Sequence, residues 1–472
     1  MKKTKIVTSI GPASASVEVF KQMVEAGANT ARINFSHATI EERVNVVDVV
    51  KKVRKLTNKE IAILYDTKGP EFRNGEVQEN GINLQAGNKI RIVKDEVIGN
   101  EERFSVNHPQ AVDSLNIGDI VLLENGLMKI EVIEKDENSV NCKIINGGIL
   151  FSRKSLAAPG VKLDIPFISE VDREDIIYAC NHDGDYLAAS FVESKENILE
   201  IREILKEQNR EDMRIIAKIE SQTGLNNLEE IAQVADGLMV ARGDLGVEVP
   251  MEDLPICQKK IISCARKNKK ICIVATEMLE SMKHNPRPTR AEVTDIANAV
   301  YNGTDAVMLS GETTTGEYPI ETVKSMASVC EHIEESIFYK NIFADTTLED
   351  PTDAVIKSVA VAANSLDAKL IVVPTLSGFS ARLISNLEPK CPILALVRNE
   401  HDANLLSLNY GVYTKVVDYW NDMNEIISKS VDEAKNFINL EKGDNIIITG
   451  GFATETNKNE STPTNLMKIE TI

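Results

Sequence analysis

Polar residues suited to phosphate and metal chemistry follow short apolar runs in the first two thirds of the chain. Glu220 and Asp244 each close such a run, with no cysteine or histidine beside them. Hard oxygen ligands without nitrogen or sulfur favour Mg²⁺ or Mn²⁺ over zinc, and Mg²⁺ leaves positions open for substrate phosphate. Arg32 and Lys218 supply positive charge of the kind that stabilises a phosphoryl group in transfer. These residue types predict a metal-assisted reaction of a phosphorylated substrate.

The stretch RGDLG at 242–246 adds a possible anion site. Glycine lets the backbone approach a ligand closely, and backbone N–H groups that open a helix attract a carboxylate or phosphate. The chain has neither a GxxxxGK[ST] loop nor the HRD and DFG motifs of protein kinases. A nucleotide must therefore be held in some other way.

Parallel strands alternating with helices would bring these residues together. Continuous apolar runs are typical of strands buried on both faces, and they occur at 5–10, 30–36, 61–66, 186–192, 214–220, 237–244, 271–278 and 305–312. Amphipathic stretches between them predict helices at 17–26, 40–56, 195–207, 224–235 and 253–268. Eight such units predict a TIM (β/α)₈ barrel, whose active site lies at the C-terminal strand ends.

Two further regions interrupt or follow this pattern. Residues 70–166 carry short alternating runs and a turn signal at Asn125-Gly126, which predicts a small β-barrel lid inserted in the barrel. The barrel then comprises 1–69 and 167–345. Strand and helix patterns restart after that point, so 346–472 is predicted to be a separate C-terminal α/β domain with a regulatory role.

Composition excludes several classes of partner. The net charge of −19 argues against nucleic acid or an anionic membrane. No apolar run approaches the roughly 18 residues that span a bilayer, and Gly11-Pro12 interrupts the N-terminal run too early for a signal peptide. The seven cysteines are scattered, as expected of core residues in a reducing compartment. We therefore expect a cytoplasmic enzyme.

Long collinear motifs resemble the pyruvate kinase family over nearly the whole chain, among them KTKIVTSIGPAS, ARINFSH, DTKGPEFRNGE, IIAKIES, GLMVARGDLGVEVP and NPRPTRAEVTDIANAVYNGTDAVMLSGET. The resemblance implies a barrel, an inserted lid and a C-terminal domain, usually assembled as a homotetramer. It also implies transfer of the phosphoryl group of phosphoenolpyruvate to ADP in glycolysis, with Mg²⁺ (or Mn²⁺) and K⁺ as cofactors.

The resemblance assigns roles position by position. Lys218 would neutralise the transferring phosphoryl group and the developing enolate, and Arg32 would contact that phosphoryl group. The other implied roles are Mg²⁺ binding by Glu220 and Asp244, carboxylate binding near Gly243, Asp244 and Thr276, proton delivery by Ser310 and Thr276, K⁺ binding by Asn34, Ser36, Asp66 and Thr67, and ADP binding by Arg73, His37, Asn34 and Lys162. Glu71, the sixth residue of DTKGPE, accompanies K⁺ dependence in this family.

A phosphorylated effector is a further expectation. Hydroxyls and a glycine precede the helical run 381–389, namely Thr375, Ser377, Gly378 and Ser380. Free N–H groups there could bind phosphate, as the resemblance implies, but Ser377 or Ser380 could equally be an ordinary N-cap. The loop 450–465 holds no Arg or Trp, which disfavours fructose 1,6-bisphosphate and favours a monophosphate.

Two other classes of function remain open. Another enolate-forming barrel enzyme, an aldolase or lyase, would share the Glu220 and Asp244 pair but would need neither the lid nor Lys218. A non-catalytic scaffold on a decayed barrel would not preserve the polar strand ends. Dependence of pyruvate formation on ADP distinguishes both from a pyruvate kinase.

Overall fold

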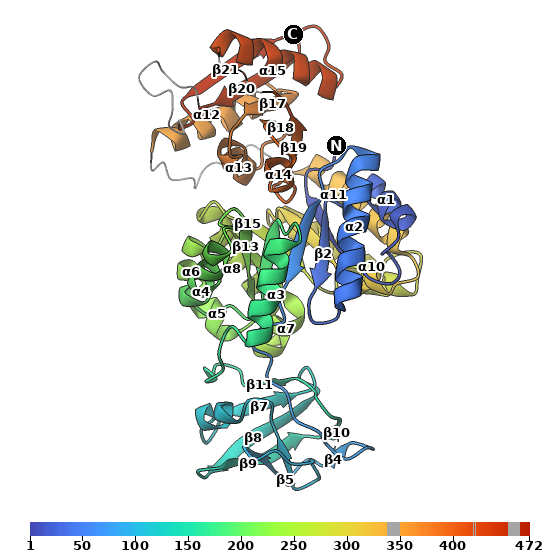
Figure 1. The fold of residues 1–472 in the computed structure, drawn as a ribbon, viewed down its shortest axis with the longest axis vertical. Helices are drawn as coiled ribbons and strands as arrows, with labels where there is room; N and C mark the ends of the chain where they lie inside the picture. The colour runs from blue at the N-terminus through green and yellow to red at the C-terminus, as the bar shows by residue number, and fades with distance from the viewer. Residues whose placement is uncertain (338–349, 419, 421, 452–462) are drawn as a thin grey trace.

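The computed structural model describes residues 1–337, 350–418, 420, 422–451 and 463–472, in three parts stacked along the long axis (Figure 1). The barrel occupies the middle, the inserted sheet lies at one end and the C-terminal sheet at the other. The predicted domain boundary at 345/346 lies outside the described residues.

Eight parallel strands close into the predicted barrel, in the order β1-β16-β15-β14-β13-β12-β3-β2. Their bounds are β1 (Lys5–Ser9), β2 (Thr30–Asn34), β3 (Ala62–Asp66), β12 (Tyr186–Ala189), β13 (Arg214–Ile219), β14 (Gly237–Ala241), β15 (Ile271–Ala275) and β16 (Ala306–Leu309). All of them except β3, which ends at Asp66 as predicted, stop one to three residues before the end of the predicted run, because the polar residues that follow leave the strand and begin loops or helices.

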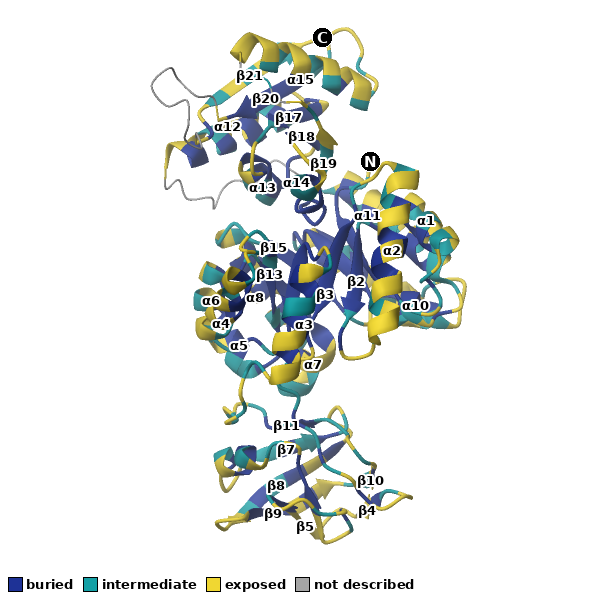
Figure 2. Ribbon diagram, viewed as in Figure 1, coloured by how far each residue is buried: buried dark blue, intermediate teal, exposed yellow. Residues whose placement is uncertain are grey.

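Amphipathic helices surround the barrel, with buried stripes facing the strands and exposed faces outward (Figure 2). Capping boxes fix the starts of several; in α2 the Thr39 hydroxyl accepts from the Glu42 N–H and the Glu42 carboxylate from the Thr39 N–H. The helices of this part are α1 (Val17–Ala26), α2 (Ile40–Thr57), α3 (Glu170–Asn181), α4 (Lys195–Glu207), α5 (Gln222–Asn226), α6 (Leu228–Val234), α7 (Arg242–Glu248), η2 (Met251–Asp253), α8 (Leu254–Lys267), η3 (Glu280–Lys283), α9 (Arg290–Tyr301), α10 (Gly311–Thr314) and α11 (Pro319–Ser336).

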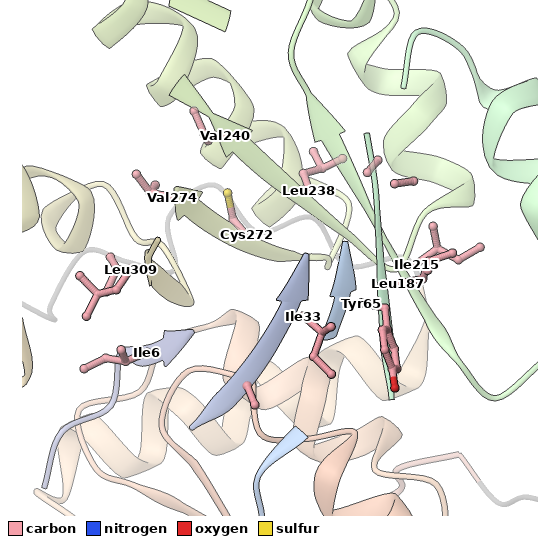
Figure 3. Packing of buried hydrophobic residues seen from close by; sticks show 14 of the residues in the cluster. Ile6, Ile33, Tyr65, Leu187, Ile215, Leu238, Val240, Cys272, Val274 and Leu309 are labelled. Atoms are coloured by element: carbon pink, nitrogen blue, oxygen red, sulfur yellow. The ribbon is translucent and has the colours of Figure 1, made fainter. Parts of the chain in front are cut away.

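Two layers of apolar side chains hold the barrel. Figure 3 shows the outer layer, in which Ile33, Tyr65 and Leu187 lie with other strand residues against the helices. Inside the barrel, Ile216 and Met239 belong to a second cluster that also contains Leu408 from the C-terminal part. Leu408 of the C-terminal part thus closes the barrel at the N-terminal ends of its strands. The C-terminal strand ends, at the opposite end of the barrel, remain available for chemistry.

The inserted part has its own core. A six-stranded sheet in the order β11-β7-β8-β9-β5-β6 lies beside a two-stranded ribbon, β10-β4. The antiparallel pairing of β7 with β8 confirms the turn predicted at Asn125-Gly126, which here joins the two strands of a hairpin. The bounds are β4 (Ile82–Leu84), β5 (Lys89–Val93), β6 (Arg103–Ser105), η1 (Pro109–Ser114), β7 (Ile120–Leu123), β8 (Met128–Lys135), β9 (Ser139–Asn146), β10 (Gly148–Leu150) and β11 (Leu156–Ala157).

The C-terminal part is an α/β sheet in the order β19-β18-β17-β20-β21, with only β21 antiparallel. Its elements are α12 (Pro351–Ser365), β17 (Leu370–Pro374), α13 (Phe379–Asn386), β18 (Ile393–Val397), α14 (Glu400–Asn404), β19 (Val412–Val416), α15 (Met423–Phe437), β20 (Asn445–Gly450) and β21 (Leu466–Thr471). Among the described helices, none combines the length and apolar character needed to cross a bilayer.

Candidate active site

The C-terminal strand ends open into a cavity of about 410 Å³. It gathers most of the predicted site residues, from strands that are far apart in sequence: Arg32, Asn34, Ser36, His37, Asp66, Thr67, Arg73, Lys218, Glu220, Asp244 and Thr276. Lys162 lines an adjoining cavity of about 320 Å³, which extends toward the inserted sheet and shares Glu71, Arg73, Glu220 and Asp244 with the first.

Lys218 lies at the centre of a buried polar cluster. Its Nζ is 3.0 Å from Asp66 Oδ1, 3.0 Å from Glu220 Oε1 and 2.6 Å from Ser190 Oγ. Burial alone would lower the pKa of this lysine, but the Asp66 and Glu220 carboxylates outweigh it and raise the pKa. The ammonium group is therefore charged and fixed in place at the floor of the cavity.

Arg32 is held in the same cluster. Its Nε donates to Asp66 Oδ2 at 2.7 Å and its Nη1 donates to Ser9 Oγ at 2.7 Å. Burial would raise the pKa of Asp66, but Arg32 and Lys218 together bring it below its ordinary value. Asp66 therefore remains a carboxylate that orients two cations, and Nη2 of Arg32 has no hydrogen-bond partner within the described residues.

Glu220 directly follows β13, and Asp244 lies in the first turn of α7, which follows the neighbouring strand β14; both face the same cavity. Glu220 accepts from the Phe191 N–H at 2.6 Å and is 1% exposed. Burial raises the pKa of Glu220 to about 7; Lys218 opposes the shift and the charge of Asp244 adds to it. Two carboxylates that repel each other beside an open cavity fit a divalent cation, which would relieve the repulsion. In the described part of the chain, no three or more acidic, histidine or cysteine side chains are placed so that together they could hold a metal ion.

The RGDLG stretch opens α7, as the anion-site prediction requires. The Gly243 N–H donates to Thr276 Oγ1 at 2.9 Å, which ties the start of α7 to the end of β15. Thr276 and Glu277 have φ values of 70° and 54°, and Phe191 near Glu220 has 54°. Left-handed backbone at non-glycine residues costs about 1–3 kcal/mol each and concentrates at functional sites. The mouth of the barrel therefore carries strained residues next to its polar groups.

Oxygen atoms predominate on the other side of the cavity. Asn34 Oδ1 accepts from the Ser36 N–H at 3.0 Å, and Thr67 Oγ1 accepts from the Ser190 N–H at 3.0 Å. With Asp66 these residues supply amide, hydroxyl and carboxylate oxygens, a donor set that fits a hard monovalent cation.

Arg73 reaches the cavity from the inserted segment. Its Nε and Nη2 donate to the Glu71 carboxylate at 2.9 and 3.1 Å, and its Nη1 donates to the Arg153 carbonyl at 2.8 Å. The ion pair fixes the planar guanidinium at the edge between the two cavities, where it can meet an anion.

Ser310 lies apart from this group. It follows β16 and its N–H donates to Glu312 Oε2 at 2.7 Å, but among the described residues it is not one that lines either cavity. The structure therefore brings Thr276 to the cavity without Ser310.

Ser190 belongs to the cluster although no sequence argument identified it. Its Oγ is 3.3 Å from Asp66 Oδ1 and donates to the Thr67 carbonyl at 2.7 Å, besides its contact with Lys218. The only signal in the sequence is its position directly after β12.

The candidate effector segment begins α13 at Phe379, and its cap is Gly378, with a φ of 71° and no side-chain cap hydrogen bond. The expectation that Ser377 or Ser380 could be the N-cap is therefore wrong: the left-handed turn suits glycine, and its N–H donates to Thr375 Oγ1 at 3.1 Å. Ser380 instead bonds Thr464 at 2.6 Å. Residues 452–462, most of the loop used to argue against fructose 1,6-bisphosphate, lie outside the described residues.

Known proteins match the chain from end to end. The family model "Pyruvate kinase, barrel domain" matches residues 1–323, and "Pyruvate kinase, alpha/beta domain" matches 353–470. A pyruvate kinase of Geobacillus stearothermophilus is 43% identical over 100% of the chain and 80% of its own length; one of Bacillus licheniformis is 42% identical over 99% and 80%. The crystal structure of a pyruvate kinase from Cryptosporidium parvum superposes with a TM-score of 0.93 at 34% identity, covering 100% of this chain and 96% of that one.

Proposed function

Because the chain belongs to the pyruvate kinase family, we propose how its residues divide the work of the reaction. The enzyme is a phosphotransferase that moves the phosphoryl group of phosphoenolpyruvate to ADP. The bond between phosphorus and the enol oxygen breaks, a bond to an oxygen of the ADP β-phosphate forms, and the enolate left behind takes a proton on its methylene carbon to give pyruvate.

Lys218 and Arg32 stabilise the group in transfer. The single observation that carries this assignment is the position of Lys218 Nζ, fixed by Asp66, Glu220 and Ser190 at the cavity floor. A fixed ammonium does not reorganise as charge shifts from phosphoryl to enolate oxygen, and such preorganised charge is a large contribution to catalysis. The free Nη2 of Arg32 is available to a phosphoryl oxygen.

Glu220 and Asp244 hold Mg²⁺ or Mn²⁺ in this proposal. The divalent cation supplies charge neutralisation for the phosphoryl and enolate oxygens. The mutual repulsion of the Glu220 and Asp244 carboxylates in the cavity supports their assignment as metal ligands. Asn34, Ser36, Asp66 and Thr67 hold K⁺, supported by their shared oxygen chemistry at one wall of the cavity.

The substrates fill the remaining space. The start of α7 at Gly243 and Asp244, with Thr276, receives the carboxylate of phosphoenolpyruvate. Arg73, His37 and Asn34 contact ADP from the first cavity, and Lys162 from the adjoining one, with the inserted sheet as a lid. Thr276, which lines the cavity, delivers the proton to the enolate; Ser310 lies outside the cavity lining, so its part in proton delivery runs through intervening groups.

Membership of the family supports three further proposals, on the compartment, the oligomeric state and an effector. We place the enzyme in the cytoplasm, supported by seven free cysteines. We propose a homotetramer, and a phosphorylated monoester as effector at Thr375, Ser377, Gly378 and Ser380. Ser377 is exposed and its carbonyl accepts from Arg382 Nη1, so Ser377→Glu should remove the effector response by repelling phosphate while basal activity stays. A full response in that variant would place the effector elsewhere.

A coupled assay of pyruvate formation tests the proposed reaction. With phosphoenolpyruvate, K⁺ and Mg²⁺, pyruvate should form only when ADP is added. Formation of pyruvate at the same rate without ADP would indicate a phosphatase or lyase and would contradict the proposal.

A further inference from the structure

A separate cavity of about 340 Å³ lies at the N-terminal end of the barrel, where it meets the C-terminal part. Figure 1 shows β13 and β15 below α13 at this junction. Arg214 begins β13 and lines this cavity, whereas Lys218 near the end of the same strand lines the active site. The volume lies at the lower end of the range for small-molecule pockets.

Cations without carboxylate partners line this cavity. Lys270 Nζ donates to the Ala235 carbonyl at 2.6 Å, and Arg382 Nη1 donates to the Ser377 carbonyl at 2.9 Å. Within the described ranges, no carboxylate lies at ion-pair distance from Lys270 or Arg382. Arg214 is 3.3 Å from Asp236, but Asp236 is also 2.9 Å from Arg202, so one carboxylate serves two guanidinium groups. Among the described residues, Lys270 and Arg382 are thus the two cations of the lining without an ion-pair partner, although the lining as a whole holds four basic and four acidic side chains.

The acidic residues of the cavity are otherwise engaged. Asp353 pairs with Lys269 at 2.8 Å, and Asp350 caps α12 by accepting from the Asp353 N–H. Asp305 accepts from the Cys272 N–H at 2.8 Å, and burial raises the pKa of its carboxyl to about 7. None of these carboxylates neutralises Lys270 or Arg382.

Two buried polar atoms of the cavity lining have no hydrogen-bond partner in the described part of the chain, Arg214 Nε and Asn409 Oδ1. Asn409 is 3% exposed. Buried polar atoms are nearly always paired in folded proteins, because an unpaired one costs about 1–3 kcal/mol. The unpaired Arg214 Nε–H calls for a hydrogen-bond acceptor on a bound ligand, and the unpaired Asn409 Oδ1 calls for a donor.

The cations also disfavour one another. Burial lowers the pKa of Arg382 to about 10, and the charge of Arg214 acts in the same direction. Burial also lowers the pKa of Lys270; the charge of Asp236 opposes this shift, and those of Arg202, Arg214 and Arg382 add to it. A bound anion would relieve this repulsion.

We propose that this cavity binds a small phosphate monoester. Its phosphate lies among Arg214, Lys270 and Arg382, which suit a multiply charged oxyanion better than a single carboxylate. A hydroxyl of its organic part donates to Asn409 Oδ1. Apolar side chains beside these groups cover the carbon skeleton: Ile271, Phe379, Leu383 and Leu405. This site is distinct from the active site and from the Thr375–Ser380 segment.

Calorimetric titration of the full-length enzyme tests the proposal, with inorganic phosphate, ribose 5-phosphate and ribose as probes. Saturating phosphoenolpyruvate and Mg²⁺, without ADP, keep the probes out of the active site. Ribose 5-phosphate should bind, and both Lys270→Ala and Arg382→Ala should weaken it at least tenfold. Lys267→Ala is the matched control, because Lys267 is 73% exposed on α8 and pairs with Glu229, and it should bind within twofold of wild type. Ser377→Glu removes the proposed effector site near α13, so the ribose 5-phosphate binding that remains in that variant should be the binding that Lys270→Ala weakens.

The outcomes separate clearly. Binding of ribose 5-phosphate alone identifies a monoester, and equal binding of inorganic phosphate identifies free phosphate as the occupant while keeping the site. Binding that Ser377→Glu abolishes but Lys270→Ala spares would overturn the proposal and place the phosphate at the start of α13. The absence of measurable binding to wild type would overturn it as well. Should Arg382→Ala fail to fold by circular dichroism, Lys270→Ala against Lys267→Ala decides.

Discussion

Replacing Lys218 by methionine removes the ammonium group that joins Asp66, Ser190 and Glu220. The fold should persist, because methionine occupies a similar volume and Asp66 keeps its ion pair with Arg32 at 2.7 Å. Glu220 loses its cation, and a buried carboxyl in that position takes up a proton instead of remaining an unpaired charge.

Two effects then lower the rate. Loss of one preorganised charge reduces turnover by about 10²–10³. Burial already raises the pKa of Glu220, and losing the Lys218 ammonium raises it further, which weakens Glu220 as the proposed Mg²⁺ ligand. We expect a combined loss of at least about 10³ in kcat, or roughly 4 kcal/mol in activation free energy.

The assay is steady-state pyruvate formation at saturating phosphoenolpyruvate, ADP, Mg²⁺ and K⁺. Lys267→Met, which alters an exposed lysine of α8, is the control and should match wild type. Circular dichroism should show the same secondary structure in all three proteins. A Lys218→Met enzyme within tenfold of wild type would refute the role of the ammonium group.

Three further predictions concern metal, potassium and pH. Glu220→Gln or Asp244→Asn should raise the Mg²⁺ concentration for half-maximal activity at least tenfold with the fold intact, and unchanged titration curves in both would leave them as structural carboxylates. Activity should require K⁺, with Na⁺ a poor substitute, because Glu71 provides no ammonium group near the phosphoryl site; full activity with only a bulky organic cation would contradict this. The carboxylates of Asp185, 3.6 Å from Nδ1, and of Asp212, 2.9 Å from Nε2, raise the pKa of His401. Protonated His401 therefore stabilises the folded state fully below pH about 6.5, and this contribution is lost as the pH rises through the folded-state pKa. The melting temperature of wild type should exceed that of His401→Gln at pH 5.5, and the difference should shrink by pH 8. A difference that does not change with pH would disprove the linkage.

Sequence patterns predicted the barrel well for a physical reason. Its strands are buried on both faces, so each is a continuous apolar run, and polar residues mark where each strand stops. The prediction placed every strand end except that of β3 slightly too late. At 242–244, for example, the chain turns directly into α7, because the residues after Ala241 adopt helical backbone that no apolar pattern indicates.

Side-chain geometry set the limit of prediction at the site. Ser190 contacts Lys218, 28 positions away in sequence, only because β12 and β13 lie side by side in the closed barrel. At α13 the sequence offered two serines as caps, whereas the required left-handed turn selected Gly378. The cavity at the other end of the barrel combines residues of β13, α13 and the segment before β15, an association that no local pattern encodes.

Phosphorus NMR of the complete reaction tests the central claim most directly. With phosphoenolpyruvate, ADP, Mg²⁺, K⁺ and a catalytic amount of the enzyme, the phosphoenolpyruvate signal should fall while the γ-phosphate signal of ATP rises by the same amount. Growth of an inorganic phosphate signal in place of ATP, or no loss of phosphoenolpyruvate, would contradict the assignment of phosphoryl transfer to this barrel mouth.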